Sequence, residues 1–144
     1  EILAEVVFDL KASIRSKDAV IEIADLPTVL GDRTQIRIFF RNLIENALKF
    51  HPVAARPHVW VNASEEEDSN DISITVQDNG IGIESGKHEQ VFTIFKRLNS
   101  ETDFSGTGLG LAICRRIAVN HGSIITLVSN PGEGAAFSIR LPRA

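Results

Sequence analysis

Three alternate glycines stand directly before an amphipathic segment near the end of the chain. Gly106, Gly108 and Gly110 lead into apolar residues at helical spacing between Leu111 and Ile117. Glycines let the backbone pass close to phosphate oxygens, and a helix start offers free N–H groups and the positive end of the helix dipole. A plain flexible loop would lose conformational entropy through three glycines and gain nothing in return. The run therefore predicts a phosphate-binding site.

A polar stripe upstream has the chemistry to complete such a site. Asn42, Asn46 and Lys49 follow one another at i, i+4 and i+7, which places them on one face of a helix. An amide oxygen can fill a Mg²⁺ shell otherwise made of water and phosphate oxygens, and a lysine supplies a point charge for the same phosphates. Asn46 and Lys49 suit these two tasks. The alternative is an ordinary solvated helix edge, which is the commoner meaning of an isolated Asn-x-x-Lys.

A carboxylate with two following glycines offers a way to recognise a base. Asp78 comes directly after an alternating strand pattern and before Gly80 and Gly82. Its carboxylate could accept a hydrogen bond from the exocyclic amine of a purine while the glycines leave room for the ring, which would select adenine over guanine. The alternative is an Asx turn that closes the strand, with Asn79 and Gly80 as ordinary turn residues.

One arginine lies in an apolar segment between the two glycine motifs. Arg97 belongs to residues 92–98, where phenylalanine, isoleucine and leucine are interspersed with polar residues. The segment could be ordinary amphipathic packing. Alternatively, Arg97 meets a terminal phosphate when the surrounding residues close over the site, because a guanidinium suits bidentate phosphate contact.

Composition limits the classes of protein that fit. The chain has 144 residues, of which 43% are hydrophobic and 24% charged, so residues 1–144 are expected to form one domain. A net charge of −4 gives no general attraction to nucleic acids or anionic membranes. No run approaches the ~20 apolar residues of a membrane span. Cys114 is the single cysteine, so no internal disulfide can form and a cytoplasmic setting is expected. The chain contains no methionine, so we expect it to be a fragment of a longer protein.

The helices and strands that must position these residues are predicted from the spacing of apolar residues and from residues that begin or end such elements. Helices are predicted over residues 2–14, 32–50 and 107–120, with Asp32 as a helix cap and Pro52 as a stop. Strands are predicted over 20–23, 28–30, 58–63, 72–76, 124–128 and 136–141. Residues 84–106 are irregular and form a candidate lid. Since strands adjacent in sequence are paired without regular βαβ alternation, we expect an α+β fold with helices on one face of a mixed, mainly antiparallel sheet.

Taken together, the motifs resemble the ATP-binding catalytic domain of bacterial sensor histidine kinases, within the wider group that includes DNA gyrase. Residues 42–50 resemble the N box of that family, 78–83 the first glycine box, 92–98 the F box and 106–111 the second glycine box. The boxes occur in the family's order and the likeness covers essentially the whole chain. Residues 89–98 are also similar to phytochrome-type kinases.

The resemblance implies a two-layer α/β sandwich of the Bergerat type that binds ATP and Mg²⁺ between the helix of Asn46 and the lid. It implies that Asn46 holds Mg²⁺, that Asn42 and Lys49 assist at the phosphates together with Arg97, and that Asp78 reads adenine. The positions carried over for nucleotide binding are Asn42, Asn46, Lys49, Phe50, Asp78, Gly80, Gly82, Ile83, Thr107, Gly108, Leu109, Gly110 and Leu111.

Two positions depart from the wider group in ways that bear on the reaction. Where gyrase-like members carry a glutamate as base for water, the matching residue is Asn42, which suits phosphoryl transfer to a protein histidine with little ATP hydrolysis. Ala136 stands where relatives often carry threonine, so one hydrogen bond near the nucleotide is expected to be missing.

The phosphoacceptor histidine of such a kinase is missing from the chain. His88 and Glu89 begin a similar motif but lack the proline that follows it. The resemblance therefore implies an upstream domain that carries the histidine and a downstream response regulator, and the fragment alone is expected not to autophosphorylate. Two alternatives remain: a degenerate nucleotide-binding module that regulates a partner, and an ATPase or serine-directed kinase of the same fold, which Asn42 and the F box disfavour.

Overall fold

The computed structural model describes residues 1–52, 54–67, 69–92 and 109–144. The helices are α1 (Ile2–Asp9), α2 (Lys11–Ser16), α3 (Arg33–Lys49) and α4 (Gly110–Asn120), with short 3₁₀ turns η1 (Ser85–Lys87) and η2 (Gln90–Phe92). The strands are β1 (Val20–Ile23), β2 (His58–Glu65), β3 (Asp71–Asp78), β4 (Ile125–Ser129) and β5 (Ala135–Pro142). In these ranges no helix is long and apolar enough to cross a lipid bilayer.

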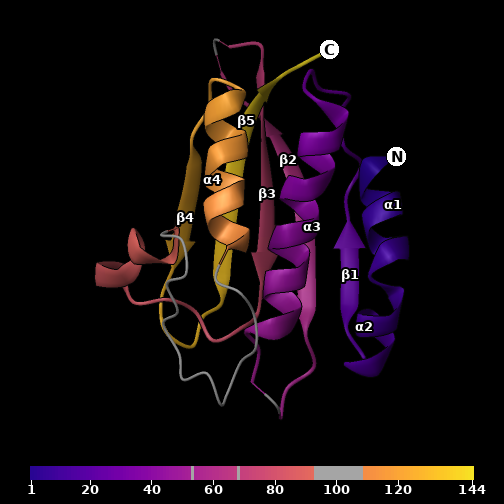
Figure 1. Cartoon of the computed structure of the whole chain (residues 1–144), viewed down its shortest axis with the longest axis vertical. Coiled ribbons are helices and arrows are strands. Elements are labelled where there is room, and N and C mark those ends of the chain that lie inside the picture. Colours follow the sequence, from indigo (N-terminus) through magenta and orange to yellow (C-terminus); the bar gives the residue numbers. More distant parts are fainter. Residues whose placement is uncertain (53, 68, 93–108) are drawn as a thin grey trace.

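The strands form one sheet in the order β1-β2-β3-β5-β4. β1 and β2 are parallel, whereas the pairs β2–β3, β3–β5 and β4–β5 are antiparallel. Figure 1 shows α3 and α4 side by side in front of this sheet, with α1 next to α3. The predicted fold, a two-layer α/β sandwich with a mixed and mainly antiparallel sheet, is confirmed.

The core lies between the helices and the sheet because α3 and the strands each have one apolar face. Asp32 caps α3 as predicted, since its carboxylate accepts the Gln35 N–H at 2.8 Å. The largest fully buried side chains come from both layers: Phe39, Ile44, Leu48, Ile72, Ile139, Leu141, Val6, Val59, Val61, Val76 and Cys114.

Two predicted elements were wrong in detail. The helix expected over 2–14 is divided at Leu10, although the Leu10 N–H still bonds Val6 O and the Ile14 N–H still bonds Leu10 O. Because these bonds continue the helical hydrogen-bonding pattern past Leu10, the apolar spacing stays regular and does not reveal the division into two helices. The strand expected over 28–30 is only an isolated bridge between Val29 and Arg143, since helix α3 begins soon after it.

The element ends that carry the predicted motifs meet at one end of the molecule. In Figure 1 the C-terminal ends of α3 and β3 and the N-terminal end of α4 all point toward the lower part of the picture. α4 begins at Gly110 in the structure, so the predicted start at 107 falls outside the described residues. The sheet and helices therefore bring the N box, the first glycine box and residues 109–111 of the second glycine box to the same side of the fold.

Cys114 provides a direct test of the packing between α4 and α3. The thiol is fully buried with its Sγ 3.5 Å from Phe39 O, and burial raises its pKa to about 12. We expect iodoacetamide at pH 8 to alkylate the native protein more than ~100-fold more slowly than the urea-unfolded chain, because both access and the thiolate fraction fall. Equal rates measured by mass spectrometry would contradict this packing.

Candidate nucleotide site

The polar stripe of α3 begins at Asn42, beside the start of α4. Asn42, Asn46 and Lys49 are half-buried, and within the described ranges no other side chain or backbone group makes a hydrogen bond or ion pair with their side chains. A Cβ placed on Gly110 would lie 3.2 Å from Asn42 Oδ1, so α4 begins directly against the stripe. Half-buried amides without protein partners next to a helix N-terminus are suited to a ligand with phosphate oxygens.

Asp78 ends β3 with its carboxylate partly buried. Its Oδ1 accepts the N–H groups of Gly80 at 2.8 Å and Ala135 at 3.3 Å. The first bond is the Asx turn considered above as the alternative, and it occupies only one of the two oxygens. No described residue donates a hydrogen bond to Oδ2, so this oxygen remains able to accept from a ligand. The turn and the recognition of an amine are thus compatible.

The electrostatics of Asp78 combine opposing effects. Burial raises the pKa of this carboxyl, while the hydrogen bonds from Gly80 and Ala135 and the nearby His51 lower it, with burial the larger effect. A hydrogen bond from a ligand N–H would stabilise a carboxylate held in this way, because a buried charge is costly until it is paired.

Close backbone contacts explain the glycines of the first box. A Cβ on Gly80 would lie 2.4 Å from Phe50 O, and one on Gly82 would lie 1.9 Å from Asn130 O. Gly82 also has a φ of +73°, which disfavours any other residue. The space beside both glycines is therefore filled by protein backbone, so they are needed for the packing of the loop itself.

Asn79 fastens the same loop to the segment between α3 and β2. Its Oδ1 accepts the His58 N–H at 2.8 Å and faces His51 Nε2 at 3.1 Å, while its Nδ2 donates to Arg56 O at 3.0 Å. The other ring nitrogen of His51 lies 2.9 Å from Pro52 O. In the sequence, Asn79 before Gly80 is typical of an ordinary turn, and a lone histidine before a proline carries no signal, so only the fold shows that Asn79 and His51 meet.

The register of β5 shows which residue of this strand lies next to Asp78, the residue expected to recognise the base. Ala135 pairs with Asp78, is buried, and faces the core side together with Phe137. Ala136 alternates to the other face of the sheet. The residue of this strand next to Asp78 is therefore Ala135, and the expectation for Ala136 is corrected.

Several predicted site residues lie outside the described residues. These are Arg97, Thr107 and Gly108, together with most of the candidate lid and the F box after Phe92. Of the second glycine box, the structure describes Leu109, Gly110 and Leu111, which open α4. Ile83 is described, and its N–H bonds the Ser129 hydroxyl at 2.8 Å.

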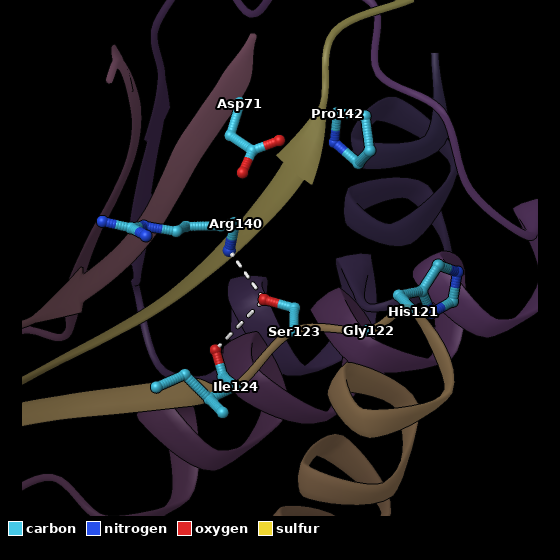
Figure 2. A pocket seen from close by; sticks show the side chains of 7 residues that line it. All are labelled: Asp71, His121, Gly122, Ser123, Ile124, Arg140 and Pro142. Atoms are coloured by element: carbon cyan, nitrogen blue, oxygen red, sulfur yellow. Dashed lines mark hydrogen bonds between the residues drawn. The ribbon is translucent and has the colours of Figure 1, made fainter. Parts of the chain in front are cut away.

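A hollow of about 250 Å³ lies at the opposite end of the molecule (Figure 2). Figure 2 shows Ser123 between Arg140 and Ile124, and its hydroxyl accepts the Arg140 N–H and donates to Ile124 O. His121 is equally engaged: its Nδ1 lies 2.8 Å from Ile117 O and its Nε2 accepts the Asp32 N–H. These polar groups already have protein partners, so the hollow is a poor candidate for the nucleotide.

The sandwich and the site at the ends of α3, α4 and β3 define a nucleotide-binding domain. A family model described as "Histidine kinase-, DNA gyrase B-, and HSP90-like ATPase" matches residues 31–144, so the chain belongs to this family. The chain is 39% identical over 142 residues to a phytochrome-like protein, Cph1, of Synechocystis sp., covering 99% of the chain and 19% of that protein. It is 35% identical over 145 residues to the adaptive-response sensory kinase SasA of Prochlorococcus marinus, covering 98% of the chain and 38% of that protein.

Solved structures support the same assignment. Full-length ShkA in complex with AMPPNP matches with a TM-score of 0.82 and 29% identity, covering 99% of the chain and 30% of that structure. The mycobacterial sensor histidine kinase MprB matches with a TM-score of 0.80 and 27% identity, covering 98% of the chain and 94% of that structure. The chain is thus an ATP-binding domain of the kind found in sensor histidine kinases, and it spans between 19% and 38% of the length of the two curated relatives.

Proposed function

We propose that this domain binds ATP with Mg²⁺ and donates the γ-phosphoryl group to a histidine on an upstream domain of the same protein. The observation that carries the proposal is that Gly110 at the start of α4 lies against Asn42 of α3, while Gly80, whose N–H bonds Asp78, packs against Phe50 at the end of the same helix. Relatives named as sensory and sensor histidine kinases support this direction. In such a system a response regulator would receive the phosphoryl group, in the cytoplasm where ATP is available.

Different residues would bind different parts of the nucleotide. Asp78 would accept the adenine amine through its Oδ2, while the N–H groups of Gly110 and Leu111 in the first turn of α4 would meet the phosphates. Asn46 would be the protein ligand of Mg²⁺, whose remaining shell would be phosphate oxygens and water. Lys49, and Arg97 outside the described residues, would stabilise charge on the transferring phosphoryl group.

The chemistry of Asn42 favours transfer to a protein over hydrolysis. A neutral amide cannot take the proton of an attacking water, whereas a carboxylate in its place could. The histidines of the described range are each engaged: His51, His88 and His121 by hydrogen bonds within the fold, and His58 by Glu22 and by stacking on Trp60. The acceptor histidine would therefore lie on another domain.

Calorimetry tests the proposal directly. Titration of the domain with a non-hydrolysable ATP analogue is expected to give micromolar, magnesium-sensitive binding, and the matching GTP analogue is expected to bind much more weakly. Nucleotide binding without preference for adenine would contradict the role of Asp78. Phosphohistidine formed on the isolated domain would contradict the assignment of the acceptor to a second domain.

Removal of the proposed magnesium ligand gives a sharper test. In Asn46→Ala the affinity measured with Mg²⁺ should fall roughly tenfold or more, toward the magnesium-free value, because one ligand of the ion is lost. Alanine is well tolerated in a helix, so α3 should remain folded. Asn62→Ala, which removes an exposed amide from β2, is the matched control. An unchanged magnesium dependence in Asn46→Ala would rule out this ligand.

A further inference from the structure

Ser129 is a buried polar residue that the proposed site does not yet use. It is the last residue of β4 and is 7% exposed. Its hydroxyl oxygen accepts the Ile83 N–H at 2.8 Å and its proton is donated to Gly134 O at 2.5 Å. One side chain thus joins the loop after β3 to the turn between β4 and β5.

The second of these bonds leads to Asp78. The carbonyl of Gly134 and the N–H of Ala135 belong to the same peptide group, and that N–H donates to Asp78 Oδ1 at 3.3 Å. The bonds therefore run without a break from the Ile83 N–H through Ser129 and the Gly134–Ala135 peptide to the carboxylate. Hydrogen bonds in such a chain polarise one another, so the donor that meets Asp78 is strengthened by the serine hydroxyl.

Neighbouring contacts leave the two loops little freedom to move separately. The Gly132 N–H donates to Ile81 O at 2.7 Å, and a Cβ on Gly134 would lie 2.0 Å from Asp78 O. The loops at residues 78–83 and 129–135 are thus packed as one unit, and Ser129 is its buried polar centre.

We propose that Ser129 is a positioning residue for nucleotide binding: through the Gly134–Ala135 peptide and the Ile83 N–H it fixes the carboxylate of Asp78 and the loop after it in the geometry that accepts adenine. The proposal rests on the proposed function of Asp78 as the adenine acceptor. Ser129 itself touches neither the base nor the phosphates in this scheme.

Ser129→Ala should weaken binding of the ATP analogue about fivefold to thirtyfold, since it leaves a buried N–H and a buried C=O without their shared partner. The preference for adenine over guanine should fall by a similar factor. Inorganic tripolyphosphate should bind as in the wild type, because the start of α4 is unaffected. The pH below which the analogue is released should also rise, since weaker donation from Ala135 raises the pKa of Asp78.

Three further variants make the result decisive. Ser138→Ala removes a hydroxyl that bonds Thr75 on the other face of the sheet and should change none of these readouts. Ser129→Cys keeps a weak donor and should show a smaller loss of affinity, and it serves as the test if Ser129→Ala does not fold. Asp78→Asn tests the proposed function itself, and adenine-selective binding retained there would overturn that function.

Two outcomes would overturn the role of Ser129 alone. In the first, Asp78→Asn loses adenine-selective binding, but the folded Ser129 variants keep the affinity, the adenine selectivity and the pH dependence of the wild type. The other is an equal loss of tripolyphosphate and nucleotide affinity in Ser129→Ala, which would show general loosening of the fold in place of positioning at the base.

Discussion

Asp78→Asn is expected to lower the affinity for an ATP analogue about a hundredfold while leaving the nucleotide-free domain at least as stable as the wild type. In the variant, the amide oxygen can still accept the N–H groups of Gly80 and Ala135 that now bond Oδ1. The amide nitrogen must then take the place of Oδ2. There it would face the adenine amine, and because both groups are hydrogen-bond donors, no hydrogen bond could form between them. A buried mismatch of this kind costs far more than a missing methylene.

The stability expectation follows from the pKa of Asp78, which burial raises above its ordinary value of 3.8. A carboxyl with a raised pKa in the folded state imposes no cost in acid, where both states are protonated. As pH rises through 3.8 and then through the folded-state pKa, ionisation favours the unfolded chain and the folded state loses stability. The advantage of Asp78→Asn should therefore be present at pH 7 and disappear below pH 3.8.

Two measurements are needed for this variant. Calorimetry with the ATP and GTP analogues gives affinity and selectivity, and thermal unfolding at neutral and acid pH gives stability. Asp71→Asn, at the other end of the same strand, is the matched control and should bind nucleotide as the wild type does. A variant that loses both binding and neutral-pH stability would show that Asp78 holds the fold together, and the assignment to adenine would then lose its support.

Much of the fold was predictable from local signals in the sequence. Helix α3 was expected over 32–50 and is found at Arg33–Lys49, because its cap at Asp32 and its apolar periodicity are both encoded within the segment. The long strands β2, β3 and β5 were also found near their expected positions. The convergence of the motifs followed from the family resemblance, since four short motifs in a fixed order carry more information than any one of them.

The parts that could not be predicted depend on contacts between distant segments. Ser129 looks like any polar residue at the end of a strand, and only the fold brings it to Ile83 and Gly134. The position of Ala135 next to Asp78 depends on strand register, where an offset of one residue moves a side chain to the other face. Glycines were expected to leave room for the base, but the structure places backbone from Phe50 and Asn130 beside Gly80 and Gly82.

This last finding predicts a graded series of glycine substitutions. Gly82→Ala is expected to destabilise the domain by about 3 kcal/mol or more, because it adds a clash to an unfavourable backbone conformation. Its Cβ would lie 1.9 Å from Asn130 O at a φ of +73°. Gly132→Ala has a similar φ of +79° but nothing within 4 Å of the new Cβ, so only the conformational cost of about 1 kcal/mol should remain.

Gly86→Ala completes the series, since its Cβ would meet nothing within 4 Å and its φ is not in the left-handed region. It should change the free energy of unfolding by less than about 0.5 kcal/mol. Urea unfolding of the three variants separates the two effects: the difference between Gly132→Ala and Gly86→Ala measures backbone strain, and the further loss in Gly82→Ala measures the contact with Asn130. If Gly82→Ala costs no more than Gly132→Ala, the turn at residues 130–134 can move away from the loop at 78–83. The two loops would then not form the rigid unit from which Asp78 is presented to the nucleotide.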